Sequence, residues 1–296
     1  MKKHFVFSYT NILIREIEKK KYLSFLRRIF GLVYKLIINL SKRFTNKIVN
    51  LDKKKNSSKY FSLCLSKLFE YFNSDKGSTL KIDNQEKIIK THNYTIFYEK
   101  YFKKLKNQNI KILELGSHEG RGLASLYYYF PNSSLCGANI NPFQMCFYTK
   151  RIDEIYIDVS SKKILKNFNR YFDKEFDIII DDASHNLKDI LQTLPILFKN
   201  LKEGGFYVIE DINQFDVFKN LNPTNEKLTP IKILQFMKEN KKFNSKFISE
   251  EDIKYLKENI EEYFFEKGEM VVNGTNISDI VFLKKMLKKL YSAELI

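Results

Sequence analysis

Two adjacent aspartates and a histidine follow an apolar run in FDIIIDDASH, residues 176–185. A buried strand that ends in two like charges needs a cation nearby, because an unpaired buried carboxylate is costly. A metal ion, a cationic cofactor or a cationic substrate could supply that charge. Asp182 and His185 lie three residues apart where the strand ends, so both can face one ligand. Asp181 should point the opposite way, toward a helix or a lysine, if the extended backbone persists.

Further acids lie at the ends of other apolar segments. Glu114 lies near the end of IKILEL, Asp158 lies near the end of EIYIDV, and Glu210 and Asp211 follow FYVI. Clustered carboxylates suit a hard divalent cation such as Mg²⁺, which prefers oxygen ligands. For a single acid, a helix cap or a lysine ion pair is the simpler explanation. Doubled acids after two strands favour a metal site.

Strand and helix patterns alternate from residue 110 onward, and this alternation predicts how the acids are positioned. We expect strands at 110–115, 133–140, 154–159, 176–183 and 206–212, a helix that closes on Gly204 and Gly205, a helical insertion at about 229–258, and two closely spaced strands within 263–273 and 278–285. The pattern predicts an α/β, doubly wound, Rossmann-like fold with a seven-stranded sheet, mostly parallel, whose final strand is antiparallel. Function is then expected at the carboxyl ends of the strands.

A glycine-rich turn follows the first of these strands in ELGSHEGRG, residues 114–122. Gly116 and Gly120 let a ligand approach the backbone and the N-terminus of the next helix. The spacing is not GxGxxG and no phosphate-binding lysine follows it, so the turn alone indicates only a nucleotide-like ligand. We expect His118 to bond locally. His92, in THNYTIFYEKYF, is equally consistent with the mouth of an active site beside Tyr94 and with a core or capping role.

The formal net charge of +16 lies mostly in one terminal segment. Residues 1–60 hold 16 basic and three acidic residues, a net charge of +13, whereas the other 236 residues hold 35 basic and 32 acidic residues, a net charge of +3. This distribution argues against nucleic-acid binding by the main domain. The three cysteines form no CxxC pair, which indicates neither a disulfide framework nor a zinc site and favours a reducing compartment.

The terminal segment contains the sequence YLSFLRRIFGLVYKLIINLSKRF, residues 22–44. On a helix it shows a wide apolar face and a narrow basic stripe, which is typical of a helix that lies in a membrane interface. Packing on the main domain or on a second subunit, giving a homo-oligomer, is the alternative. A membrane span is disfavoured by Arg27, Arg28 and Lys35. We expect a cytoplasmic protein, peripheral on the inner face of the membrane if the helix is interfacial.

The composition divides the chain into two parts. Residues 1–60 form a basic helical extension that ends in a solvated linker, LDKKKNSSKY, at 51–60. Residues 61–296 form the main domain, with its core at 110–285 and an insertion at about 213–258 that is expected to cover the substrate.

Several motifs together resemble a known family. The stretch that begins ILELGSHEGRG resembles the first motif of class I S-adenosylmethionine-dependent methyltransferases. SDKGSTL, HNYTIFYEKYF, FDIIIDDASH and LFKNLKEGGFYVIEDI together resemble the metal-dependent sugar O-methyltransferases of macrolide biosynthesis, the mycinamicin type. The resemblance runs from about residue 70 to 285 and excludes the first 60 residues. DDASH combined with GGFYVIED is fairly specific, whereas the glycine motif marks only the superfamily.

The resemblance assigns roles to individual residues. It implies a Mg²⁺ site made by Asp182, Glu210 and Asp211, with His185 as the general base. It also implies an S-adenosylmethionine site lined by Glu114, Gly116 and Asp158, and we expect Gly120, Asn139 and Asp181 to contribute to that site. Asn139 departs from the pattern, because the second strand of these enzymes usually ends in an acid that holds the ribose hydroxyls. An asparagine can still bond a hydroxyl, without the charge.

The function implied is Mg²⁺-dependent O-methylation of a sugar or glycan hydroxyl with S-adenosylmethionine as methyl donor. The metal would neutralise the buried acids and make a bound hydroxyl easier to deprotonate, and His185 could accept its proton. The alternatives are methylation of another small hydroxylated metabolite and a methyltransferase-like binding module recruited to membranes.

Overall fold

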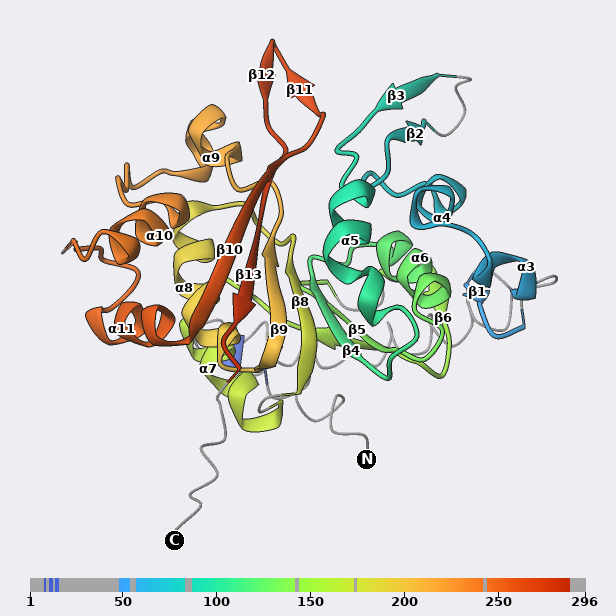
Figure 1. The fold of residues 1–296 in the computed structure, drawn as a ribbon, viewed down its shortest axis with the longest axis horizontal. Coiled ribbons are helices and arrows are strands. Elements are labelled where there is room, and N and C mark those ends of the chain that lie inside the picture. The colour runs from blue at the N-terminus through green and yellow to red at the C-terminus, as the bar shows by residue number, and fades with distance from the viewer. Residues whose placement is uncertain are drawn as a thin grey trace, which may run out of the picture.

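The computed structural model describes residues 8, 11, 12, 14, 15, 48–53, 57–82, 87–141, 144–172, 175–241 and 244–287. Its centre is a seven-stranded sheet with the strand order β10-β13-β9-β8-β4-β5-β7 (Figure 1). The strands are β4 (Lys111–Leu115), β5 (Ser134–Asn139), β7 (Ile152–Tyr156), β8 (Phe176–Asp181), β9 (Leu201–Ile209), β10 (Ile260–Lys267) and β13 (Asp279–Lys285). β13 is antiparallel to both its neighbours, and the other pairs are parallel. The predicted fold class, including its antiparallel final strand, is confirmed.

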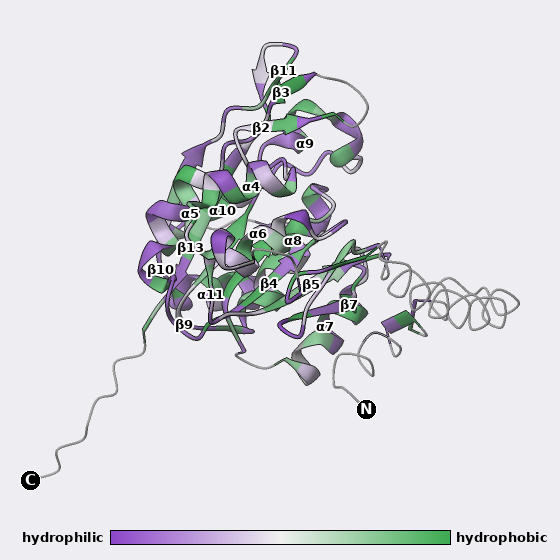
Figure 2. Cartoon of the chain, turned by 90° about the vertical axis from the view of Figure 1, so that its right-hand side faces the viewer, coloured by the Kyte–Doolittle hydropathy of each residue, from purple (hydrophilic) through white to green (hydrophobic). Residues whose placement is uncertain are grey.

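Alternate residues of each strand face opposite layers of helices, because successive side chains of a strand point to opposite faces. Ile112 and Ile178 join the core beneath α4 (Leu65–Phe72), α5 (Thr95–Phe102) and α6 (Arg121–Tyr129). Leu113 and Ile179 join the core beneath α7 (Lys162–Tyr171) and α8 (Leu187–Phe198). Figure 2 shows apolar stretches running through the sheet and the helices packed on it. Inner strands such as β4 and β8 are therefore buried on both faces, as their mostly apolar sequences predict, whereas the edge strand β10 carries several exposed residues.

The strand register brings the acidic strand ends together. Leu115 lies opposite Asp181, and Asp181 lies opposite Ile209. The next residues along these strands, Asp182 and Glu210, therefore emerge at the same edge of the sheet. Two hairpins, β2 (Thr79–Lys81) with β3 (Ile88–Lys90) and β11 (Val271–Val272) with β12 (Thr275–Asn276), project from this end of the molecule (Figure 1).

The helix before β9 ends earlier than the sequence pattern predicts. α8 ends at Phe198, and Leu201 to Gly205 belong to β9 instead of to the helix. The buried ammonium of Lys285 donates to the carbonyl oxygens of Phe198 (3.1 Å) and Leu201 (2.6 Å). These bonds satisfy carbonyls that a longer helix would use internally, so a contact from the far end of the chain contributes to the end of the helix.

The insertion after β9 contains α9 (Gln214–Val217), the 3₁₀ helix η2 (Lys219–Leu221), α10 (Pro230–Lys238) and α11 (Glu250–Asn259). α11 contacts α8, and α10 contacts α11, so both lie on the flank of the sheet (Figure 1). α9 follows directly after the strand end that carries Asp211. The role of the insertion as a substrate cover therefore stays a prediction. Within the insertion, α9 is the element that follows Asp211 most closely along the chain.

The described part of the first 60 residues packs on the main domain. β1 (Val49–Asn50) pairs with β6 (Phe147–Tyr148), and α3 spans Ser57–Phe61. Leu51 is fully buried, and Asp52 Oδ1 accepts hydrogen bonds from Tyr127 Oη and Thr149 Oγ1, both at 2.8 Å. The expectation of a solvated linker is thus wrong at Leu51, which is buried, whereas Asp52 is exposed although hydrogen bonds hold its carboxylate.

The amphipathic helix predicted at 22–44 lies outside the described residues, so its membrane or packing role stays a prediction. Within the part of the chain that the structure describes, no helix has the length and apolar character that a membrane span requires.

Candidate active site

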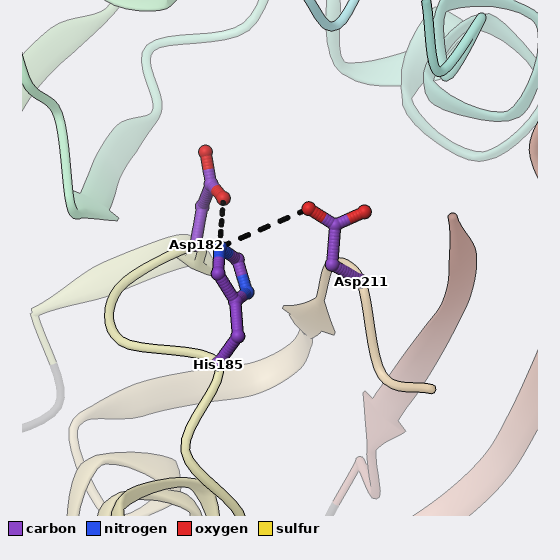
Figure 3. Close-up of side chains that lie close together, drawn as sticks. All are labelled: Asp182, His185 and Asp211. Atoms are coloured by element: carbon purple, nitrogen blue, oxygen red, sulfur yellow. Dashed lines mark ion pairs between the residues drawn. The ribbon is translucent and has the colours of Figure 1, made fainter. Parts of the chain in front are cut away.

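Asp182, His185 and Asp211 gather at the carboxyl edge of the sheet (Figure 3). Asp182 follows β8, Asp211 lies just beyond β9, and His185 comes from the loop that leads into α8. His185 Nε2 lies 3.5 Å from Asp182 Oδ1 and 3.8 Å from Asp211 Oδ2. His185 and Asp211 have positive φ angles of 51° and 53°. Such backbone conformations are uncommon outside glycine and cluster at functional sites.

The donor atoms of this cluster fit a divalent metal ion. One ligand atom from each of the three residues lies within 4.8 Å of the others. Two carboxylates supply the hard oxygen ligands that Mg²⁺ prefers. The structure therefore brings together two of the three predicted metal ligands, with the predicted base beside them.

Glu210, the third predicted ligand, is turned toward Lys76. Lys76 Nζ lies 2.5 Å from Glu210 Oε2, it also donates to Asp182 Oδ2, and Tyr98 Oη donates to Glu210 Oε1. Lys76 belongs to the SDKGSTL turn between α4 and β2, and its side chain is only 4% exposed. Burial lowers the pKa of Lys76, but the surrounding carboxylates outweigh it and hold this pKa well above its usual value. The lysine is therefore a permanent cation among these acids.

Lys76 also faces Glu114, the acid of the first strand. Its Nζ lies 3.4 Å from Glu114 Oε1. Burial raises the pKa of Glu114 to about 7, against the opposing effect of Lys76. Sequence reasoning assigned Lys76 no role although it lies in the SDKGSTL motif, because most lysines are exposed.

The other side of Asp211 is held by residues from the segment before α5. Tyr94 Oη donates to Asp211 Oδ1 at 2.5 Å, and His92 Nδ1 lies 3.1 Å from the same oxygen. Burial lowers the pKa of His92, but its contact with Asp211 outweighs burial and raises this pKa overall. Of the two roles open for His92, the structure places it in the wall of the site beside Tyr94, where it is buried.

Two cavities lie beside the cluster and share Gly116. A cavity of about 610 Å³ is lined in part by Glu114, Gly116 and Asp182, and one of about 200 Å³ by Gly116, Asn139 and Asp158. Gly116 has a φ of 80°, and a Cβ there would lie 1.9 Å from the carbonyl oxygen of Asp182. Only glycine allows this approach, so the glycine-rich turn and the end of β8 are in direct contact.

Gly120 and Asn139 shape the same region. Gly120 precedes α6 with a φ of 80°, and a Cβ there would lie 2.6 Å from Met145 Cγ. It lines neither of the two cavities. Asn139 Nδ2 donates to the carbonyl oxygen of His118 at 3.5 Å, which ties the end of β5 to the glycine-rich turn.

Asp158 has a partner from the N-terminal segment. Its Oδ1 accepts from Ser160 Oγ at 2.6 Å, and its Oδ2 lies 2.6 Å from Arg15 Nε. Asn11 Nδ2 donates to the carbonyl oxygen of Tyr156 on the adjoining strand. Residues far outside the recognised motifs therefore reach the wall of the smaller cavity, which no pattern in the sequence indicates.

Asp181 lies apart from both cavities, although we expected it to contribute to the cofactor site. It is buried, and Tyr207 Oη of β9 donates to its Oδ2 at 3.0 Å. Its partner is thus a tyrosine on the neighbouring strand and not the helix or lysine that alternation alone predicts. Burial raises the pKa of Asp181 to about 6.

Asp181→Asn is expected to stabilise the protein at neutral pH. Folding raises the pKa of Asp181 from 3.8 to about 6. Between pH 3.8 and about 6, the folded state therefore binds more protons than the unfolded state. The contribution of Asp181 to the free energy of unfolding therefore falls as pH rises through this window and stays low above it. The substitution should raise the free energy of unfolding by about 1–3 kcal/mol at neutral pH and leave it unchanged below pH 4. Urea unfolding from pH 4 to 8 measures this, and a less stable variant at neutral pH would contradict it.

No protein-family profile matches this chain. A stretch of 133 residues is 30% identical to the mycinamicin VI 2''-O-methyltransferase of Micromonospora griseorubida. A stretch of 130 residues is 32% identical to the 8-demethyl-8-(2-methoxy-alpha-L-rhamnosyl)-tetracenomycin-C 3'-O-methyltransferase of Streptomyces olivaceus. Each match covers 41% of this chain but only 32% of the relative, so the chain spans about a third of the curated relatives it matches.

A solved structure shares the fold over most of the chain. It is a methyltransferase of the mycinamicin biosynthetic pathway in complex with Mg, S-adenosylhomocysteine (SAH) and mycinamicin VI. The match has a TM-score of 0.56 and 21% identity, and covers 79% of this chain and 57% of that one. A second crystal of the same enzyme, with Mg and SAH, gives a TM-score of 0.55 at 21% identity, covering 79% and 58% of the two chains. The resemblance that the motifs predict is confirmed, and so is the methyltransferase-like fold.

Proposed function

We propose that this protein is an S-adenosylmethionine- and Mg²⁺-dependent O-methyltransferase that acts on a sugar hydroxyl. The observation that carries the proposal is the Asp182–His185–Asp211 cluster, which adjoins a two-part cavity at Gly116. The names of the relatives support the acceptor class, because they describe O-methylation of sugar-bearing macrolides and polyketides.

The two cavities suit the two halves of S-adenosylmethionine. The smaller one offers Asn139 and Asp158, whose side chains can bond ribose hydroxyls and an adenine amino group. The larger one contains Glu114 and the backbone of the glycine-rich turn, which can receive the methionine half. Their junction at Gly116 would place the sulfonium near the end of β8, beside Asp182.

Asp182, Glu210 and Asp211 would hold the metal. Bound there, Mg²⁺ supplies Lewis acidity that makes a coordinated hydroxyl easier to deprotonate. Asp182 and Asp211 already converge, whereas Glu210 would have to leave Lys76 to join them. Tyr94 and His92 both lie against Asp211 Oδ1, so Oδ2 is the oxygen of this carboxylate that faces the cluster.

His185 would act as the general base. Its side chain is 22% exposed, so an acceptor can reach it from solvent, and its Nε2 faces the two aspartates. The acceptor oxygen forms a bond to the methyl carbon, the bond between that carbon and sulfur breaks, and the hydroxyl proton passes to His185. The protein accelerates the reaction by holding oxygen, carbon and sulfur in line and by receiving the proton.

Titration calorimetry and a methyl-transfer assay test the proposal. The wild-type protein should bind SAH, and it should transfer labelled methyl groups to glycosylated macrolides with Mg²⁺ present and lose this activity in EDTA. Activity that is equal in Mg²⁺ and EDTA contradicts the metal requirement. Absence of SAH binding at millimolar concentration contradicts the enzyme assignment itself.

A further inference from the structure

Lys76 occupies an unusual position for a lysine. Its side chain is 4% exposed, and its ammonium contacts three carboxylates, those of Glu114, Asp182 and Glu210. Each of the three acids comes from a different strand of the sheet, β4, β8 or β9, or from its end. One side chain from outside the sheet thus links three neighbouring strand ends.

Lys76 lies among more carboxyl groups than its single positive charge can neutralise. One ammonium faces three carboxyl groups, and Asp211 adds a fourth nearby. Buried carboxylates without a compensating cation repel one another strongly. When these carboxyl groups are ionised, Lys76 alone cannot neutralise them, so a divalent cation would stabilise their charged form.

Lys76 also controls which carboxylate oxygens face the metal cluster. Its ammonium donates a hydrogen bond to Asp182 Oδ2, so Oδ1 is the oxygen of Asp182 that faces His185. It engages Glu210 Oε2 while Tyr98 engages Oε1, so both oxygens of this predicted ligand are occupied. To bind a metal ion, Glu210 would therefore have to give up its ion pair with Lys76.

We propose that Lys76 is a positioning residue that serves as a built-in cation of the site. It holds Asp182 and Glu210 in place when no divalent metal is bound, and its charge limits how tightly the metal binds. The role rests on the proposed metal-dependent function. It deepens that function, since Lys76 keeps the site preformed and the bound metal exchangeable.

Lys76→Met tests the role, because methionine keeps much of the length of the side chain and removes its charge. Without metal, the melting temperature should fall by about 10 °C, since the carboxylates lose their shared partner. Loss of the repelling ammonium and release of Glu210 should tighten Mn²⁺ binding about tenfold. Mn²⁺ affinity is read from the electron paramagnetic resonance signal of the free ion. Saturating Mn²⁺ should also raise the melting temperature more in the variant than in the wild type.

Lys81→Met is the matched control. Lys81 lines the same cavity but is exposed, and among the described side chains no acid pairs with its ammonium. Removing this charge should change Mn²⁺ affinity less than about twofold, because solvent screens it. An equal gain in the two variants would show a general charge effect and overturn the specific role of Lys76.

A double variant keeps the test decisive if Lys76→Met does not fold. Combining Lys76→Met with Glu210→Gln removes one cation and one carboxylate together, so the metal-free melting temperature should recover relative to Lys76→Met. No recovery overturns the role of Lys76 as partner of Glu210.

The outcomes separate this role from the function on which it rests. If wild-type protein binds no Mn²⁺, the metal-dependent function is overturned together with the role of Lys76. If wild-type protein binds Mn²⁺ and Lys76→Met binds it with the same affinity, only the role of Lys76 is overturned. A fall in melting temperature that is equal with and without Mn²⁺ would likewise indicate a purely structural lysine.

Discussion

Asp182→Asn should abolish metal-dependent methyl transfer and weaken Mn²⁺ binding by more than about 100-fold, beyond the loss typical of residues that only support a ligand. The reason is geometric: Asp182 Oδ1 faces the cluster with His185 and Asp211, and an amide oxygen there carries no charge. The fold should persist, because the substitution also removes one of several crowded carboxylates. Mn²⁺ titrations and melting curves of the purified variant measure both effects.

Asp181→Asn is the matched control for this substitution. It makes the same chemical change one residue earlier, on a side chain that faces Tyr207 instead of the cluster. Mn²⁺ affinity should stay within about threefold of the wild type, because the side chain supplies no ligand atom. Unchanged Mn²⁺ affinity in Asp182→Asn would falsify the metal assignment, whatever the control does.

His185→Ala should slow methyl transfer by about 10²–10⁴-fold, the usual range for a lost general base. SAH affinity should be retained, because His185 is not among the residues that line either cavity. Mn²⁺ should still bind through the remaining carboxylates. Single-turnover transfer rates, with SAH and Mn²⁺ affinities measured on the same preparation, separate the chemical step from binding.

Excess Mg²⁺ distinguishes the two variants. It should leave His185→Ala slow, since added metal cannot accept a proton, whereas it can partly restore a protein with a weakened ligand. A His185→Ala enzyme that regains wild-type activity in excess Mg²⁺ would show that His185 only helps to hold the metal.

The sequence by itself was sufficient for the architecture and for the location of the acids. Five apolar runs with helical crossovers and a closely spaced final pair predicted the seven strands, because the inner strands of such a sheet are buried on both faces and mostly apolar. Asp182, His185 and Asp211 were placed at strand ends by the same pattern, and parallel strands end at one edge of a sheet.

The tertiary structure decided how the individual side chains pair. Lys76, Tyr98 and Arg15 lie 106, 112 and 143 residues from partners that they contact, Asp182, Glu210 and Asp158 respectively. A periodic pattern in the local sequence cannot predict contacts between residues so far apart in the chain. The orientation of Glu210 depends on them, since a carboxylate turns toward whichever cation or donor the fold brings near.

The differences at Asp181 and at the end of α8 have the same origin. Alternation along a strand says that Asp181 faces away from Asp182, but only the register with β9 determines that Tyr207 meets it. Helical propensity continues past Phe198, but the carbonyls there bond to Lys285 from the last strand. Local patterns thus determined the elements and the residue types at their ends, whereas pairing across the sheet decided which charges meet, because electrostatic partners depend on distance in space and not along the chain.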